Sequence, residues 1–163
     1  MPVPDYDVRV VPSLLDRLFD ENPRGDRDLV SSRSEGVRGL KRTIQRDLES
    51  LLNARNSFFD LPAEFAELGQ SVLTFGLPDF SASGTASQAG QARLLRLVEQ
   101  AIRCFEPRLG NVTVSLQSDD AKVKTVLRLR IEANVRLDPT PEPVAFDLVI
   151  PIITRRFEVK ESG

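Results

Sequence analysis

The sequence predicts an α+β domain of two layers, in which N-terminal helices pack on an antiparallel β-meander formed by the C-terminal part of the chain. Residues 35–55 and 93–105 carry apolar side chains at three- and four-residue steps, which indicates amphipathic helices. After residue 109, apolar and polar residues alternate instead, which indicates strands. The chain has 163 residues, enough for one domain with a core of its own.

The N-terminal residues are predicted to form an arm, residues 1–22, ahead of a single α+β domain over residues 23–163. A short amphipathic helix opens after Pro12-Ser13 and ends at Asn22-Pro23. Its apolar side is formed by Leu14, Leu15, Leu18 and Phe19. A helix of two turns is not stable alone. It must therefore dock either on its own domain or on a partner, and the sequence favours neither.

The next helix, residues 35–55, presents one apolar side, and its charged residues are expected to face solvent. The apolar positions are Val37, Leu40, Ile44, Leu48, Leu51 and Leu52. Two aromatic and Gly/Pro-containing segments follow, residues 58–62 and 71–79, which we predict to be buried connections across the helix ends. A short helix is expected over residues 63–68, and the small polar residues 81–91 are expected to form a flexible loop.

We call the helix over residues 93–105 the pivot helix, because the chain changes there from predicted helices to predicted strands. Its recurring apolar positions are Leu95, Val98, Ile102 and Phe105, and Leu94, Leu97 and Ala101 widen that face. Pro107 disfavours helical geometry in the preceding residue, so the helix should end near Glu106. Cys104 lies on this apolar helix, where a buried filling role is far more frequent than a nucleophilic one.

Four strands are predicted after the pivot helix. Val112 to Leu116 and Leu127 to Leu137 alternate apolar with polar or charged residues, the second over an unusually long run. Residues 144–152 form the third strand, although Pro151 disfavours a central ladder position. Residues 156–159 are expected to form a short fourth strand.

Composition argues against several classes of site and partner. The chain has no histidine, which removes a Ser-His-Asp triad and the usual zinc sites, so no metal and no cofactor is expected. The single cysteine rules out an intrachain disulfide and favours a reducing compartment, the cytoplasm. The net charge of −2 gives no reason to expect nucleic acid as a partner. Neither a signal peptide nor an apolar run near the ~20 residues of a membrane span is present, so no membrane insertion is expected.

Four motifs in a fixed order carry a resemblance to a known family. They are PSLLDRLFDENP (residues 12–23), RDLESLLNAR (46–55), SVLTFGLPD (71–79) and IRCFEPRL (102–109). This combination resembles the contractile-injection baseplate wedge proteins, which include the type VI secretion baseplate subunit TssE and its contractile-phage counterparts. The characteristic triplet of that family is matched by Glu106-Pro107-Arg108. The opening motif favours a secretion system over a phage-derived particle.

The resemblance implies a non-enzymatic structural protein that links the baseplate wedge to the first ring of the contractile sheath. TssF- and TssG-like wedge proteins would be its partners, with Glu106, Pro107 and Arg108 as the contact. An open edge of the sheet would accept strands from sheath subunits, a case of β-augmentation. The short helix with Leu14, Leu15, Leu18 and Phe19 is the second candidate for docking.

Three alternatives stay open at this point. Glu106 could pair with a nearby arginine and merely close the helix. A lysozyme-like, peptidoglycan-cleaving hydrolase would need two carboxyl groups around one bond, with Glu106 and either Asp79 or Asp16 as candidates. The absence of tryptophan and the single tyrosine argue against a sugar-binding groove. A generic α+β protein-binding module is the third alternative.

Overall fold

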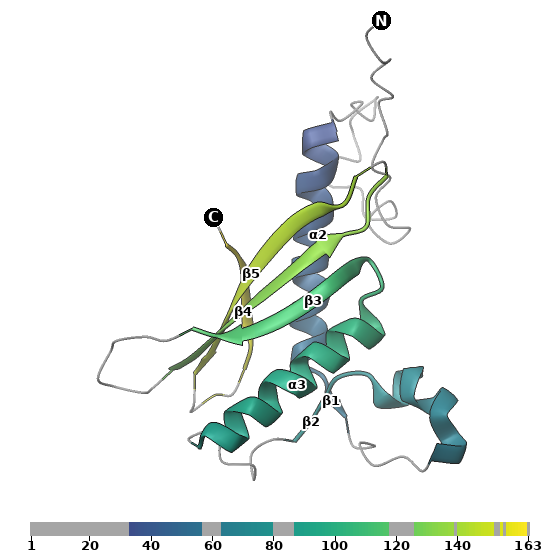
Figure 1. Cartoon of the computed structure of the whole chain (residues 1–163), viewed down its shortest axis with the longest axis vertical. Coiled ribbons are helices and arrows are strands. Elements are labelled where there is room, and N and C mark those ends of the chain that lie inside the picture. The colour runs from purple at the N-terminus through teal and green to yellow at the C-terminus, as the bar shows by residue number, and fades with distance from the viewer. Residues whose placement is uncertain are drawn as a thin grey trace, which may run out of the picture.

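Two long helices and a four-stranded antiparallel sheet form the body of the protein in a computed structural model of the chain, shown in Figure 1. The structure describes residues 33–56, 63–79, 87–117, 126–138, 140–151, 154 and 156–162. The predicted N-terminal arm with its docking helix and the connection at 58–62 lie outside the described residues. The predicted boundary between arm and domain therefore stays a prediction.

The first long helix, α2 (Arg33–Asn53), confirms the helix expected over residues 35–55, displaced by two residues at each end. The apolar positions in its C-terminal half are almost fully buried: Ile44, Leu48, Leu51 and Leu52 are each at most 2% exposed. Burial of each such side chain favours the folded state by about 1.5–3 kcal/mol. The helix is therefore held mainly by its apolar side.

The second long helix, α3 (Gln88–Phe105), begins five residues before the predicted start at Arg93. The side chain of Ser87 caps it by accepting a hydrogen bond from the Gly90 amide at 3.1 Å. The expectation of a flexible loop over 81–91 is therefore wrong for residues 88–91, which form the first turn. The predicted apolar side faces the core: Leu94, Val98, Ala101 and Ile102 are buried, and Leu95, Leu97 and Phe105 are partly buried.

The sheet has the order β3-β4-β5-β6 with antiparallel neighbours throughout, which confirms the predicted meander. Its strands are β3 (Leu109–Leu116), β4 (Val126–Val135), β5 (Glu142–Pro151) and β6 (Glu158–Glu161). The sheet strand β3 begins three residues before the predicted Val112, and β6 begins two residues after the predicted residue 156. Pro151 is the last residue of β5, so the ladder does not continue past it.

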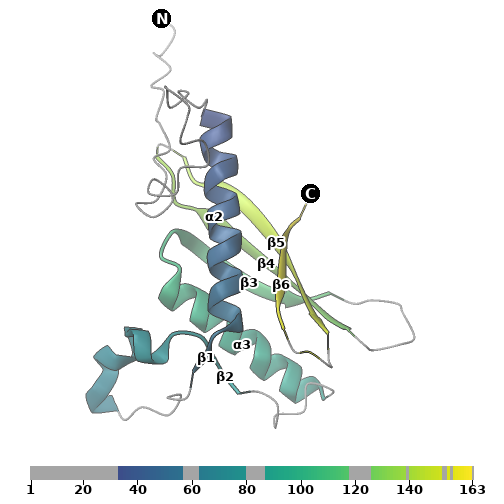
Figure 2. The ribbon, with the colours of Figure 1, turned by 180° about the vertical axis from the view of Figure 1, so that it is seen from behind.

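One face of the sheet is apolar and the other is polar, as the alternation in β4 predicts. Val114, Ile131 and Phe146 are paired across three strands and are all buried. On the opposite face the next row contains Ser115, Arg130 and Asp147. The buried side chains of both helices join those of the sheet in one core cluster, so the helices form the second layer. The helix α2 runs behind the sheet in Figure 1 and in front of it in Figure 2.

A smaller lobe connects the two helices. It contains η1 (Ala63–Gln70) and η2 (Val72–Thr74), two 3₁₀ segments, and a two-stranded parallel sheet of β1 (Arg55–Asn56) and β2 (Leu77–Pro78). The short helix expected at 63–68 is present as 3₁₀ structure with a kink at Phe65. We call residues 63–74 the η1–η2 arm.

Burial of the segment 71–79 is only partly confirmed. Thr74 and Leu77 are buried, but the side chains of Val72 and Leu73 are 85% and 54% exposed. The turn is held by polar groups instead, because the Thr74 hydroxyl donates to the Leu68 carbonyl at 2.8 Å. The turn therefore does not depend on burial of the neighbouring apolar side chains.

Candidate functional site

The candidate site is the corner between α3 and β3, formed by Glu106, Pro107 and Arg108. The helix ends at Phe105, as Pro107 predicts, and the Glu106 amide donates the last helical hydrogen bond to the Ile102 carbonyl at 2.9 Å. The Arg108 carbonyl then accepts from the Arg136 amide of the chain just after β4 at 2.8 Å. The backbone of the corner is thus fixed by the helix on one side and the sheet on the other.

Glu106 points into the protein, where only 4% of its surface is exposed. Its Oε1 accepts from Nε of Arg108 at 2.6 Å and from the Arg108 amide at 3.3 Å. Its Oε2 accepts from Nη2 of the same guanidinium group. A buried carboxylate is costly unless it is paired and hydrogen-bonded, and this two-pronged arginine contact meets both requirements.

Asp47 of α2 completes the cluster from the other helix. Its Oδ2 accepts from Nη2 of Arg108 at 2.7 Å, so one guanidinium group joins α2 to the corner. The hydrogen bond to Glu106, and then the one to Asp47, raise the pKa of Arg108 above its usual range, although burial opposes them. The arginine is therefore charged at every physiological pH.

The corner exposes only part of the triplet to solvent. Pro107 is exposed, and 30% of the Arg108 side chain is accessible, whereas Glu106 is inside. The local pairing considered as an alternative for Glu106 is therefore present, and display of the Glu106 carboxylate from the corner is not. The unfavourable position of an acid at a helix C-terminus is compensated within the chain, by Arg108.

The last turn of α3 also holds the η1–η2 arm. The Cys104 thiol lies 3.5 Å from the Gly69 carbonyl of the arm. Phe75, the residue that follows the arm, packs its ring edge to face against that of Phe105, with the ring centroids 5.4 Å apart. Burial raises the pKa of the Cys104 thiol, so the reactive thiolate is disfavoured, in keeping with the predicted filling role. The arm and the corner are therefore neighbours, as both ribbon views show (Figures 1 and 2).

Sequence reasoning missed Asp47 and the exposed arm. Asp47 occurs on the charged side of a helix, where solvation is the ordinary expectation, and nothing in its local sequence indicates a partner 61 residues away. The apolar residues of the arm are indistinguishable by type from core residues.

The carboxylate pair required for hydrolysis is not assembled among the described residues. Asp79 is exposed while Glu106 is buried with both oxygens occupied, and Asp16 lies outside the described residues. Within the same residues, no group of acidic or cysteine side chains could hold a metal ion. No helix among them is long and apolar enough to cross a membrane.

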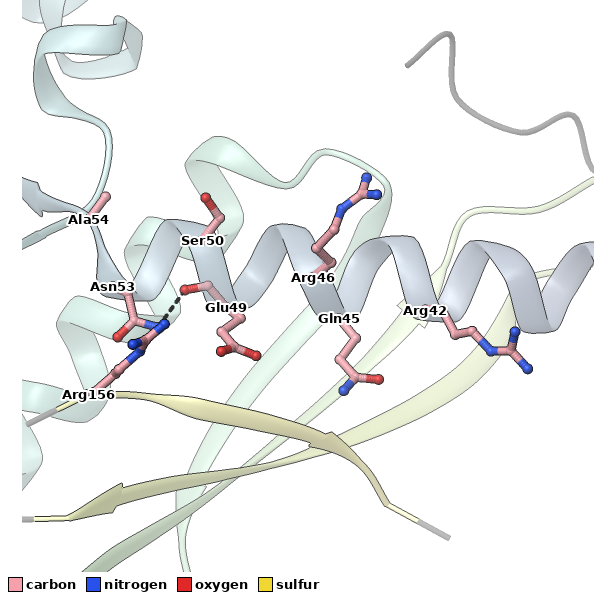
Figure 3. Close-up of a pocket in the computed structure, with 8 residues that line it drawn as sticks. All are labelled: Arg42, Gln45, Arg46, Glu49, Ser50, Asn53, Ala54 and Arg156. Carbon is pink, nitrogen blue, oxygen red and sulfur yellow. Dashed lines mark hydrogen bonds between the residues drawn. The ribbon is translucent and has the colours of Figure 1, made fainter. Parts of the chain in front are cut away.

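A groove of about 760 Å³ runs between α2 and the chain that leads into β6 (Figure 3). Its lining includes Arg42, Gln45, Glu49, Asn53 and Arg156. Asn53 donates to the Glu49 carbonyl at 2.8 Å, the bond drawn in Figure 3. The groove brings together arginine and amide side chains without a paired nucleophile and base, so its lining suits backbone or carboxylate contacts rather than catalysis.

Comparison with known protein families gives one match. The family model described as baseplate wedge protein gp25 matches residues 38–140, well over half of the chain. The matched part runs from α2 to the segment after β4 and contains the corner, but not the PSLLDRLFDENP motif at 12–23. Comparisons with curated proteins and with solved structures found no match. The match establishes that the chain belongs to the baseplate wedge protein gp25 family, a family of structural baseplate proteins.

Proposed function

We propose that this protein is a non-enzymatic component of a type VI secretion baseplate, where it joins the wedge to the first ring of the contractile sheath. The observation that carries the proposal is the family match across the corner, where Asp47 and the buried Glu106 hold the partly exposed Arg108 beside the exposed Pro107. A protein that links two assemblies must transmit their relative orientation. A corner fixed by a helix, a strand and a second helix is suited to that task.

The wedge contact is proposed to lie on Pro107 and the accessible part of Arg108, with TssF- and TssG-like proteins as partners. The proline ring is exposed and conformationally restricted, so little entropy is lost when a partner covers it. Glu106 and Asp47 hold the guanidinium group in one orientation before binding. In this scheme Glu106 is a positioning residue, and Arg108 with Pro107 touches the partner.

The sheath contact is proposed to be strand addition to the sheet, since the described sheet is open and ends in two edge strands, β3 and β6. Assembly is proposed to occur in the cytoplasm, in keeping with the single, partly buried cysteine. The N-terminal residues Leu14, Leu15, Leu18 and Phe19 remain the second proposed docking element.

A hydrolase is disfavoured on chemical grounds. Glycoside hydrolysis requires a carboxylic acid that can give its proton to the leaving group. Both carboxylate oxygens of Glu106 accept hydrogen bonds from Arg108, so this group is held as an ion pair and has no free face toward a substrate.

The test is a pull-down of purified variants with the TssF–TssG-like wedge complex of the same organism. Replacing both Glu106 and Arg108 by alanine removes the guanidinium group without leaving a buried carboxylate unpaired, and we expect loss of wedge binding. Arg96→Ala, an exposed arginine on α3, serves as the matched control and should bind normally. Circular dichroism verifies that both variants are folded.

Undiminished wedge binding by the folded double variant would remove the corner from the interface. Failure of the unaltered protein to bind either wedge or sheath components would favour a generic binding module. Turnover of purified peptidoglycan that disappears in the double variant would instead support the hydrolase.

A further inference from the structure

The free edge of β3 leaves backbone hydrogen-bonding groups open. The Gln117 amide donates to the Arg128 carbonyl of β4 at 2.9 Å. This bond shows which residues of β3 direct their backbone groups toward β4 and which direct them away. In an antiparallel pair, every second residue directs its N–H and C=O toward the partner strand. Ser115 therefore faces β4, and the backbone groups of Val114 and Leu116 point away from it.

A β-bulge limits this open stretch at its N-terminal end. The register shifts between Gly110 and Thr113, and Asn111 has a positive φ of 52°. The displaced Val112 carbonyl accepts a hydrogen bond from Nη2 of Arg103 at 2.8 Å. Within the described part of the chain, no group bonds to the outward backbone of Val114 or Leu116.

The opposite edge, the chain from Phe157 through β6, is covered by side chains of α2. The Ser162 amide donates to the Ala145 carbonyl of β5, so Phe157 and Val159 are among the residues whose backbone groups point outward. Asn53 bonds both backbone groups of Phe157, donating to its carbonyl and accepting from its amide at 2.9 Å each.

Gln45 extends this cover along the strand. Its Nε2 donates to the Val159 carbonyl at 2.8 Å, two helical turns before Asn53. Figure 3 shows the two amide side chains on the part of α2 that runs beside this edge. The helix thus occupies both backbone groups of Phe157 and the carbonyl of Val159, three of the outward hydrogen-bonding positions that an added strand would need.

We infer that the strand-accepting edge is β3, and that α2 closes the β6 edge through Gln45 and Asn53. The inference rests on the proposed function, because the occupant is an extended segment of a sheath subunit. The segment pairs with the outward backbone groups of Val114 and Leu116. Pairing stops before Val112, because the carbonyl of that residue already accepts a hydrogen bond from Arg103. The side chain of Leu116, near the C-terminal end of β3, is 37% exposed and can contact the added segment. We therefore expect the segment to place an apolar residue opposite Leu116.

Amide hydrogen exchange measured by NMR on the full chain tests this assignment, with the sheath subunit of the same organism as the probe. Without the probe, the Val114 and Leu116 amides should exchange rapidly and the Phe157 amide slowly. Addition of the sheath subunit should slow exchange at Val114 and Leu116 by about tenfold or more. The Phe157 amide should change little, because Asn53 already covers it.

Two proline variants test the same point by binding. Leu116→Pro and Glu161→Pro each remove an N–H that points away from the sheet, on β3 and β6 respectively, a position where edge strands tolerate proline. We expect Leu116→Pro to weaken sheath binding by about tenfold or more and Glu161→Pro by less than about twofold.

Sheath binding with protection gained at Val159 and Glu161 instead would overturn the edge assignment and leave the proposed function standing. The same holds if Glu161→Pro is the variant that loses binding. If the folded protein does not bind the sheath subunit at all, both the assignment and the proposed sheath contact are wrong. Because exchange is measured on the unaltered chain, a misfolded proline variant does not affect the outcome.

Discussion

The corner and the η1–η2 arm adjoin at the end of α3, yet the corner buries a charged side chain whereas the arm exposes apolar ones. At the corner, the Glu106 carboxylate is buried and each of its oxygens accepts a hydrogen bond. On the arm, apolar side chains point to solvent, with Val72 85% and Leu73 54% exposed. The corner is therefore expected to contribute to stability through ion pairing, whereas the outer side chains of the arm contribute almost nothing.

The contrast is sharper when all exposed apolar residues are considered. Six large apolar side chains are exposed among the described residues, and four of them belong to the arm: Phe65, Leu68, Val72 and Leu73. The arm keeps its shape through backbone and hydroxyl hydrogen bonds, such as the one from the Ser71 hydroxyl to the Leu68 carbonyl at 2.8 Å. The buried carboxylate of the corner and the exposed apolar side chains of the arm can lie next to each other because hydrogen bonds, rather than core packing, hold both regions in shape.

The largest effect is expected at the corner. Glu106→Ala should lower the free energy of unfolding by about 3 kcal/mol, because it leaves the partly buried Arg108 without its main partner. Urea denaturation followed by circular dichroism measures this loss. Adding Arg108→Ala to the same chain should restore part of the stability, since neither charge then remains unpaired. A cost below 1 kcal/mol for the single variant would contradict the importance of this ion pair.

A smaller effect is expected where the arm joins the body. Gly76 has a φ of +109°, and a Cβ atom there would lie 2.5 Å from the Ala54 carbonyl oxygen. Gly76→Ala should therefore destabilise the protein by about 2 kcal/mol through backbone strain and the clash. Gly69→Ala is the matched control, because nothing lies within 4 Å of its Cβ position. Thermal melts of the two variants should differ clearly, and equal melting temperatures would refute the strain.

The smallest effect on stability is expected on the outer side of the arm. Replacing both Val72 and Leu73 by serine should change the free energy of unfolding by less than about 0.5 kcal/mol, since neither side chain is packed against the core. Urea denaturation against the unaltered chain checks this. A loss above 1 kcal/mol would show that these residues contact other parts of the protein in solution.

Much of the architecture was predictable from local patterns. The alternation over Leu127 to Leu137 predicted a strand with one buried face, and β4 has that face. The periodicity of residues 35–55 predicted α2, and Pro107 predicted the end of α3. The start of α3 was predicted wrongly because the small residues before Arg93 are compatible with both loop and helix. Ser87 as a cap decides in favour of the helix.

The sequence by itself determined the α+β class, the meander and the family, because these depend on residue spacing and on motifs that are local in the chain. Only the tertiary structure decided that Arg108 pairs with Asp47, and that α2 covers backbone groups at the β6 edge of the sheet. Asp47 is 61 residues from Arg108, and Asn53 is 104 residues from Phe157. Local spacing contains no information on such pairs, because they form only when the packed layers bring distant polar groups within hydrogen-bonding distance.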